Sequence, residues 1–282
     1  MLSVIVAAHN EENGLGPCVD RLLAQGVPAD EIVVIPNGCT DRTAQCAHDR
    51  GVCVVERREP GKSAAINAGE PFAHGFPRIY LDADILVPDG ALAAVEKELA
   101  EHPDVLAVAP ARRMNTAGRP WAVRAYFAVN TQLPAFERSL FGRGMFALSE
   151  EGRKRFGEFP TLIADDLFVD SVFAPDEKAV VPEVAIVVEA PMTTRDLLAR
   201  LERVRRGNSQ MRAASQSLGI SVRAADHWAW LRDVVLPHPR LWIAAVPYAV
   251  ITAIAEHRAA RPATGAAAWG RDESTRTGLR AA

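Results

Sequence analysis

The chain lacks a strong positive charge. Its 282 residues include 32 lysines and arginines against 35 acidic residues, which gives a formal net charge of −3. Proteins that bind nucleic acid usually present a basic surface to the phosphates, so this balance argues against nucleic acid as a main partner. One local basic cluster, Arg203, Arg205, Arg206 and Arg212, does not change the balance.

Cysteine is also scarce. The four cysteines crowd into the first fifth of the chain, and none forms a Cys-x-x-Cys pair: Cys18, Cys39, Cys46 and Cys53. This spacing indicates neither a zinc site nor a disulfide framework. Reduced thiols are the simpler interpretation, so we expect a cytoplasmic location.

Apolar runs long enough to cross a membrane are missing. Residues 1–8 are apolar but carry no basic leader and are too short for a signal segment, so we expect a buried strand. Residues 241–255 are almost wholly apolar, yet about fifteen residues fall short of the roughly twenty that a spanning helix needs. A buried or oligomer-forming helix is favoured there. The aromatic residues around it leave two uses of residues 226–257 open, a homodimer contact or peripheral attachment to the inner face of the membrane.

The first half of the chain alternates between short β-branched runs and amphipathic stretches. We expect strands at 3–8, 31–35, 52–56, 78–82 and 105–110, and helices at 15–25, 41–50, 63–73 and 88–101. This alternation predicts an α/β fold with a doubly wound sheet. Ligands of such sheets bind beyond the carboxyl ends of the strands, where four polar loops would converge.

The second half follows a different pattern. We expect a strand within 141–149, two short strands near Val180 and Ile186, and a long helix from Thr194 to about Ser217. Gly142 and Gly144 precede the first of these strands, where a backbone without a Cβ could approach a ligand closely or form a tight turn. Both uses of these glycines stay open.

Two carboxylates follow the strand at 78–82, in the sequence Asp82-Ala83-Asp84. Alternate residues of a strand point the same way, so the pair is aimed at one place at the strand end. Mg²⁺ and Mn²⁺ take few carboxylates and complete their shell with phosphate oxygens, so a metal-bound nucleotide diphosphate fits here. A solvated turn explains the triplet alone equally well.

Several segments together resemble the successive signatures of family 2 glycosyltransferases with the GT-A fold. In chain order they are residues 4–12, 33–41, 61–69 and 82–84, and residues 164–167 resemble the acidic motif of that family. The resemblance implies a doubly wound mixed sheet with a Rossmann-like nucleotide-binding half and C-terminal helical additions. We therefore expect a domain at 1–193, with a donor-binding half (1–114) and an acceptor-binding, catalytic half (115–193), then a helical region (194–257) and a disordered tail (258–282).

The resemblance also implies the donor-binding residues. They are Ala8, Asn10, Glu11, Asn37, Lys62, Asp82, Ala83, Gly144 and Arg206. Asn10 could instead form an Asx-type turn that caps the following helix. Asn37 stands where many relatives carry an Asp that contacts the base, which leaves the base preference open. Lys62 opens a helix, so its ammonium and the free N–H groups there could both meet a phosphate.

The catalytic assignment rests on two pairs of carboxylates. The resemblance implies that Asp84, with Asp82, binds the cation, and that Asp166 is the base that deprotonates the acceptor, supported by Asp165. The alternative for Asp165 and Asp166 is that they only cap the helix that follows them. Direct attack by the acceptor would invert the configuration at the anomeric carbon, which is the outcome that the resemblance implies.

The expected activity is transfer of one sugar by an inverting, metal-dependent enzyme. The donor would be a nucleotide-diphosphate sugar, with UDP the commonest base in the family and GDP or TDP as alternatives, and the acceptor a hydroxyl of a sugar, lipid or small molecule. A Gln-x-x-Arg-Trp motif, found in processive relatives, is absent around Arg206, which disfavours polymer synthesis.

Two other function classes remain. A sugar-phosphate nucleotidyltransferase would usually show a glycine-rich loop after its first strand, where this chain has His9-Asn10-Glu11-Glu12. A non-catalytic, membrane-associated partner that binds sugar nucleotides would keep the fold but need neither Asp84 nor Asp166.

Overall fold

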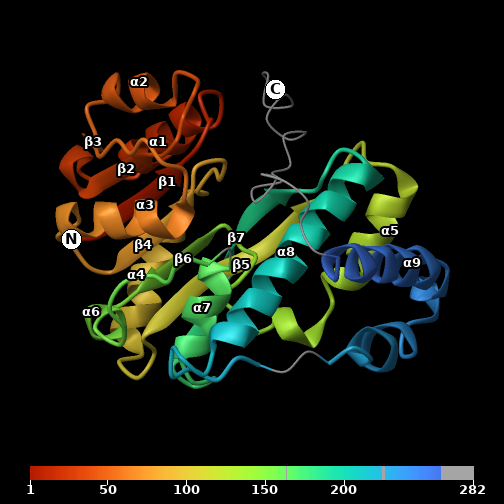
Figure 1. Cartoon of the computed structure of the whole chain (residues 1–282). Coiled ribbons are helices and arrows are strands. Elements are labelled where there is room, and N and C mark those ends of the chain that lie inside the picture. Colours follow the sequence, from red (N-terminus) through yellow and green to blue (C-terminus); the bar gives the residue numbers. More distant parts are fainter. Residues whose placement is uncertain (163, 224–225, 262–282) are drawn as a thin grey trace. The chain divides into compact units, whose positions relative to one another are not determined.

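A mixed sheet organises the fold of this computed structural model, which describes residues 1–162, 164–223 and 226–261 (Figure 1). Within that part, the sheet has seven strands in the order β3-β2-β1-β4-β6-β5-β7. The strands are β1 (Ser3–Ala8), β2 (Ile32–Pro36), β3 (Cys53–Val54), β4 (Arg78–Asp82), β5 (Ala107–Asn115), β6 (Met145–Leu148) and β7 (Lys178–Glu189). Strands β1 to β4 are parallel to one another, and β6 runs antiparallel to both β4 and β5.

The three central parallel strands end at the same edge of the sheet. Ala8, the last residue of β1, is level with Pro36 of β2, and Ala7 is level with Asp82 of β4. These strands are buried along nearly their whole length because apolar residues occupy both faces, as in other parallel sheets. The polar loops that follow them therefore meet at one edge, as the sequence predicts.

The chain divides into two compact units. Unit 1 comprises residues 1–113 and 138–188, and unit 2 comprises residues 114–137 and 189–282, of which the structure describes the residues up to 261 apart from 224–225. The helices of unit 1 are α1 (Leu15–Ala24), α2 (Thr43–His48), α3 (Lys62–Gly69), α4 (Ala91–Glu101), α6 (Glu150–Arg153) and α7 (Asp165–Val172), with short 3₁₀ turns η1 (Ala29–Glu31) and η2 (Glu70–Phe72). Among these, α3 packs on β1 and β2.

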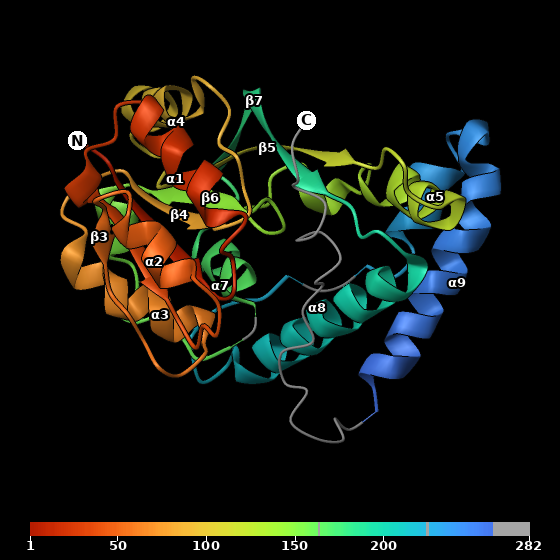
Figure 2. The same ribbon diagram turned by 90° about the horizontal axis from the view of Figure 1, so that it is seen from above.

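Unit 2 has a helical core of its own. Its elements are α5 (Trp121–Asn130), η3 (Pro134–Phe136), α8 (Thr194–Ala214), the π-helical turn η4 (Trp230–Val235), η5 (Pro239–Leu241) and α9 (Trp242–Ala259). Helix α9 packs against α5 and α8 (Figure 2). The rings of Tyr126 and Tyr248 stack with their centroids 5.0 Å apart, and the ring centroids of Trp230 and Tyr248 are 5.2 Å apart. None of the described helices is both long and apolar enough to cross a membrane.

This division differs from the domain boundaries that the sequence predicts. Residues 114–137 group with the C-terminal helices rather than with the rest of 1–193, because the apolar side chains of α5 share one buried cluster with those of α9. The assignment of donor and acceptor roles to parts of the chain stays a prediction. Helix α9 continues to Ala259, past the predicted start of the tail at residue 258, and residues 262–282 lie outside the described part.

Other element boundaries also differ from the predictions. The two short strands expected near Val180 and Ile186 are one strand, β7. The helix expected at 63–73 ends at Gly69 and continues as the turn η2, which contains Pro71; proline has no N–H to extend an α-helix. Helix α8 ends at Ala214, and β5 is longer than the expected strand at 105–110.

Candidate functional site

The Asp82-Ala83-Asp84 triplet forms a tight turn at the carboxyl end of β4. The Asp82 N–H donates to the Gly144 carbonyl at 2.8 Å, and the Ile85 N–H donates back to the Asp82 carbonyl at 3.1 Å. Ala83 is buried, whereas Asp84 is exposed and the Asp82 side chain is partly exposed. The turn therefore presents two carboxylates at the sheet edge, and Ala83 contributes packing.

Lys62 joins this turn to the start of α7. Its ammonium lies 2.7 Å from Oδ1 of Asp82 and 2.9 Å from Oδ2 of Asp165. The Lys62 side chain is 31% exposed and that of Asp165 only 5%. The Lys62 ammonium thus bridges a buried carboxylate and a partly exposed one. These three residues lie up to about a hundred residues apart in the sequence.

The charges in this cluster shift one another's protonation. Burial works to lower the pKa of Lys62, but the carboxylates of Asp165, Asp82 and Asp166 outweigh it and raise that pKa above its ordinary value. Burial raises the pKa of Asp165 to about 6, opposed by Lys62 and reinforced by Asp166 and Asp82. Lys62 consequently stays charged at neutral pH. The Asp165 carboxyl group loses its proton as the pH rises through about 6.

Asp166 is held by backbone groups. Its Oδ2 accepts a hydrogen bond from the Gly142 N–H at 2.7 Å, and its Oδ1 accepts one from the Leu167 N–H at 2.8 Å. The N-cap position of α7 is occupied by Ala164, so Asp165 and Asp166 form the first helical turn rather than the cap. Neither residue is therefore the N-cap of α7: Asp166 accepts from the Leu167 N–H within the first turn, and Asp165 pairs with Lys62.

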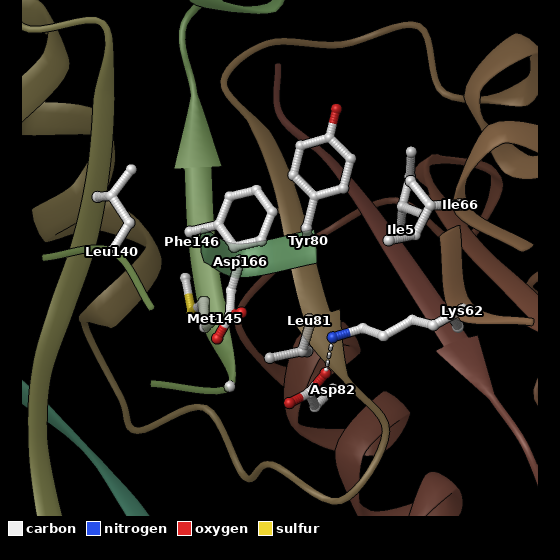
Figure 3. A pocket seen from close by; sticks show the side chains of 12 residues that line it. Ile5, Lys62, Ile66, Tyr80, Leu81, Asp82, Leu140, Met145, Phe146 and Asp166 are labelled. Atoms are coloured by element: carbon white, nitrogen blue, oxygen red, sulfur yellow. Dashed lines mark ion pairs between the residues drawn. The ribbon is translucent and has the colours of Figure 1, made fainter. Parts of the chain in front are cut away.

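Of these residues, Lys62, Asp82 and Asp166 line one small cavity (Figure 3). Its polar lining comes from Lys62, Asp82, Gly144 and Asp166, and its apolar lining from residues that include Ile5, Tyr80, Leu140, Met145 and Phe146. Figure 3 shows the Lys62 ammonium extended toward the Asp82 carboxylate. Carboxylates, one ammonium and an apolar floor are thus brought together beside the carboxyl ends of β1 and β4.

Gly144 adopts a conformation that favours glycine. Its φ is 74°, and a Cβ added there would lie 2.6 Å from Cγ1 of Ile85 and 3.6 Å from Oδ2 of Asp82. A side chain would thus meet both the left-handed backbone penalty and the packing beneath the Asp82 turn. The tight turn expected around Gly142 and Gly144 is present, since φ at Gly142 is 68°.

A Gly144→Ala substitution should therefore lower the free energy of unfolding by about 2–3 kcal/mol, the sum of the left-handed backbone cost and overpacking against Ile85. Gly26→Ala is the matched control, because φ there is 83° but nothing lies within 4 Å of an added Cβ. That control should cost only about 1 kcal/mol. Urea unfolding measures both, and equal losses in the two variants would contradict the packing argument.

A second hydrogen-bond network holds the loops after β1 and β2. The Ala8 carbonyl accepts from both the main-chain N–H and the Nδ2 of Asn37, each at 2.8 Å. Nδ2 of Asn37 also donates to the Ile35 carbonyl, and Oδ1 accepts from the Gly61 N–H at 3.0 Å. The Asn37 side chain is buried. Asn37 thus fixes the residue that precedes Lys62, and its contact with a base stays a prediction.

Asn10 and Glu11 belong to the same network. Oδ1 of Asn10 accepts from the Thr40 N–H at 2.8 Å, and the Glu11 N–H donates to the Thr43 hydroxyl at 2.7 Å. Helix α1 has Gly14 at its N-cap, without a side-chain cap. The alternative that Asn10 caps the helix after it is therefore wrong, because its side chain bonds the loop after β2.

Arg206 belongs to unit 2, whereas the other predicted site residues belong to unit 1. Its Nη2 pairs with Oε1 of Glu202 at 2.8 Å, one turn earlier on α8. Pairing along the surface of one helix accounts for this arginine without a ligand. Contact with a diphosphate stays a prediction for this residue.

Sequence reasoning did not single out Arg143, which supports the loop that holds Asp166. The Arg143 side chain is buried between Gly142 and Gly144, where Nε donates to the Ser139 carbonyl at 2.7 Å and Nη1 to that of Pro110 at 3.1 Å. Burial lowers its pKa to about 10. The sequence feature that could have indicated this role is the arginine between two glycines, because a turn on the surface does not need an arginine there.

Comparison with known proteins identifies the family. A sequence model described as glycosyl transferase family 2 matches residues 3–156, which is more than half of the chain. The chain belongs to this family. Family membership agrees with the resemblance carried by the four N-terminal signatures.

Two curated relatives in the family are similar over part of the chain. An undecaprenyl-phosphate 4-deoxy-4-formamido-L-arabinose transferase of Pseudomonas aeruginosa is 33% identical over 134 residues, which cover 44% of this chain and 40% of that protein. A 4,4'-diaponeurosporenoate glycosyltransferase of Staphylococcus aureus is 33% identical over 90 residues, 30% of this chain and 24% of that protein. The matches span less than half the length of these relatives.

Among solved structures, a mannosyltransferase of Pyrobaculum calidifontis in complex with GDP-Man and Mn²⁺ is similar over 95% of this chain and 77% of its own, with a TM-score of 0.60 and 24% identity. At this identity the likeness concerns the fold alone. Together with the mixed seven-stranded sheet of the described residues, it confirms the predicted α/β GT-A fold.

Proposed function

We propose that the protein is an inverting glycosyltransferase that moves a single sugar from a nucleotide-diphosphate sugar to a hydroxyl acceptor, with the aid of a divalent cation. The observation that supports this most is the joining of Lys62, Asp82 and Asp165 beside Asp166 at the carboxyl end of β4, in a chain of family 2. Parallel α/β sheets bind their ligands at this edge.

A metal site made by the protein alone does not fit the described residues. No group of three or more His, Cys, Asp or Glu side chains in that part of the chain is arranged to hold an ion. A donor-bound cation fits better, because Mg²⁺ and Mn²⁺ accept one or two carboxylates and complete their shell with phosphate oxygens and water. Asp84, which is exposed, and Asp82, which lines the cavity, are the residues that would hold it. When bound, the cation would supply Lewis acidity that neutralises the leaving diphosphate.

The residues of the chain then have distinct roles. Lys62 opens α3, so its ammonium and the first N–H groups of that helix can meet the diphosphate together. Asp165 and Asp82 hold the ammonium in place before the donor binds. Asp166 receives the proton of the acceptor hydroxyl as that oxygen attacks the anomeric carbon and the nucleotide diphosphate leaves with the electron pair of the broken C–O bond, which inverts the configuration at that carbon. Gly142 keeps the Asp166 carboxylate oriented through its N–H.

The proposal names the donor and the acceptor only by chemical class, so several members of each class have to be compared. UDP, GDP and TDP sugars are the donors to compare, and GDP-Man is the ligand in the similar mannosyltransferase structure. The names of the two relatives point to lipid-borne acceptors in those proteins, so a polyprenyl phosphate and a lipid carboxylate or hydroxyl should be included beside simple sugars.

Thermal unfolding with each nucleotide sugar, with and without Mn²⁺, tests the proposal. A donor at a hundred times its Kd stabilises the folded state by about 2.7 kcal/mol, which should raise Tm by roughly 5–10 °C for a chain of this size. The Asp84→Asn variant should lose the part of the shift that needs Mn²⁺.

Asp89→Asn is the control for this variant. Asp89 follows β4 a few residues later and is exposed, with its carboxylate 2.9 Å from Arg21, so its loss should leave the Mn²⁺-dependent shift intact. If no nucleotide sugar raises Tm in the wild type, the proposed donor class is refuted. An equal shift in wild type and Asp84→Asn would instead remove Asp84 from the cation site.

A further inference from the structure

The outward side of α9 is apolar and exposed. Its inward side carries Tyr248, Ile251 and Ala255, which are buried in the core of unit 2. The exposed side chains are Trp242, Ile243, Val246, Val250 and Ile254, which we call the outer α9 face, and their exposed fractions range from 37% to 75%.

Helical geometry places the outer α9 face in one stripe. Ile243, Val246, Val250 and Ile254 follow one another at spacings of three or four residues, which puts them on one side of a helix. No charged residue occurs between Trp242 and Ala255. Soluble proteins rarely leave a continuous apolar stripe of this kind in water, so the face needs an occupant.

The charge of unit 2 indicates which occupant. The described residues of unit 2 hold thirteen arginines and seven acidic side chains, an excess of six positive charges. The described residues of unit 1 hold sixteen lysines and arginines against twenty-six acidic side chains, an excess of ten negative charges. The positive charge of the chain is therefore concentrated in the unit that carries the apolar stripe.

Basic residues also flank the stripe directly. Arg240 precedes α9, and His257 and Arg258 close it; all three are exposed. Trp242 begins the helix on the exposed side and donates its indole N–H to the Val235 carbonyl at 3.1 Å. An uncharged apolar stripe with an aromatic residue at one end and arginines at both ends is the kind of face that an interfacial helix turns to a membrane, and here unit 2 covers the opposite side of the helix.

We propose that the outer α9 face docks on a lipid bilayer that contains anionic lipids. The apolar side chains leave water for the boundary between headgroups and acyl chains, and the arginines of unit 2 are attracted to the negative surface. A second copy of the chain is the less favourable occupant, because a two-fold contact through this face would bring two positively charged units together. The proposal concerns unit 2 alone and does not depend on the proposed reaction.

Vesicle flotation of the full chain tests the proposal. Wild type should float with vesicles of phosphatidylcholine that contain about a third phosphatidylglycerol, float less as salt is raised, and stay unbound with phosphatidylcholine alone. The triple variant Ile243→Gln, Val246→Gln, Val250→Gln should lower the partition coefficient by about tenfold or more, because three apolar side chains no longer leave water.

The matched control replaces exposed apolar residues elsewhere. Phe72 is 45% exposed in unit 1 and Val204 is 43% exposed on α8, so Phe72→Gln with Val204→Gln should leave flotation within about twofold of wild type. Equal Tm values for wild type and the triple variant show that the fold is kept, since all three replaced residues are exposed.

Several outcomes overturn the proposal. Wild type that stays unbound with anionic vesicles, or a triple variant that floats as well as wild type, removes the lipid assignment. Equal binding to neutral vesicles contradicts the role of the arginines. A wild type that is dimeric by light scattering, becomes monomeric in the triple variant and does not float assigns the outer α9 face to a second copy instead.

Discussion

Replacing Asp166 by Asn is expected to lower kcat by about three orders of magnitude, with the affinity for the nucleotide sugar kept within about threefold. An amide cannot take a proton from the acceptor hydroxyl near neutral pH, so the loss falls on the chemical step. Asn has nearly the same volume, and its one side-chain oxygen can still accept the hydrogen bond that the Gly142 N–H makes to Oδ2 at 2.7 Å, while the bond from the Leu167 N–H to Oδ1 is lost. The loop that carries Gly142 and Gly144 should therefore keep its position.

Two measurements separate the base role from a structural one. Single-turnover kinetics should show slow transfer at saturating donor and acceptor, and calorimetric titration should show donor binding close to that of wild type. Asp176→Asn provides the control, because Asp176 is an exposed carboxylate beyond α7 and should leave both quantities unchanged. Wild-type turnover in Asp166→Asn would refute the base assignment. Loss of donor binding in this variant would instead indicate that Asp166 contacts the donor.

The central strands could be predicted from the sequence because the pattern of apolar residues that forms each strand is local. Strands β1 and β4 have the bounds that the sequence predicts, Ser3–Ala8 and Arg78–Asp82. Each contains a run of apolar residues, at 4–8 and at 79–81, that includes β-branched or aromatic side chains and ends at a polar loop, and in a parallel sheet such runs are buried on both faces. The meeting of the loops after β1, β2 and β4 at one edge follows from this topology.

The ion pairs inside the site could not be predicted in the same way. The sequence indicates that Lys62, Asp82 and Asp165 belong to one site, but not that a single ammonium joins the two carboxylates. Contacts between residues that are far apart in the chain depend on how the helices pack on the sheet. The same applies to α5, whose apolar face looks like that of any amphipathic helix until α9 is seen to pack on it.

Asn37 shows a different limit of sequence reasoning. The motif placed this residue near the donor, yet its amide bonds Ala8, Ile35 and Gly61, and it is buried. From the sequence alone, an amide side chain that has both a hydrogen-bond donor and an acceptor is equally suited to bond the backbone or a ligand. Only the positions of the surrounding carbonyl and N–H groups reveal that the fold already uses it.

Replacing Lys62 by Met should both destabilise the protein and strongly weaken donor binding. Met keeps most of the length of the side chain but leaves Asp165, which is almost fully buried, and Asp82 without their shared cation. Removing one member of a buried pair costs about 3–5 kcal/mol, and because Lys62 is 31% exposed we expect about 2 kcal/mol at pH 8. Without an ammonium at the start of α3, the affinity for the nucleotide sugar should fall by about a hundredfold or more.

The loss of stability should depend on pH in a defined direction. Burial raises the pKa of Asp165 to about 6, above its ordinary value of 3.8, so the folded state holds this proton more tightly than the unfolded state. The stabilising contribution of that proton is complete below about pH 4 and is lost as pH rises through 6. Because Lys62 opposes this increase, its removal should raise the pKa of Asp165 further. At pH 5 the carboxyl group is mostly neutral with or without Lys62, so the variant should lose little stability there.

A second substitution makes the prediction specific to this pair. In Lys62→Met with Asp165→Asn no buried carboxylate has to ionise at that position, so urea unfolding should recover part of the lost stability at pH 8 and show almost no difference between pH 5 and pH 8. Donor binding should stay as weak as in Lys62→Met, because the amide restores no positive charge. If Lys62→Met loses as much stability at pH 5 as at pH 8, the ion pair with Asp165 is not the cause of the loss, and the position of Lys62 between the two carboxylates has to be reconsidered.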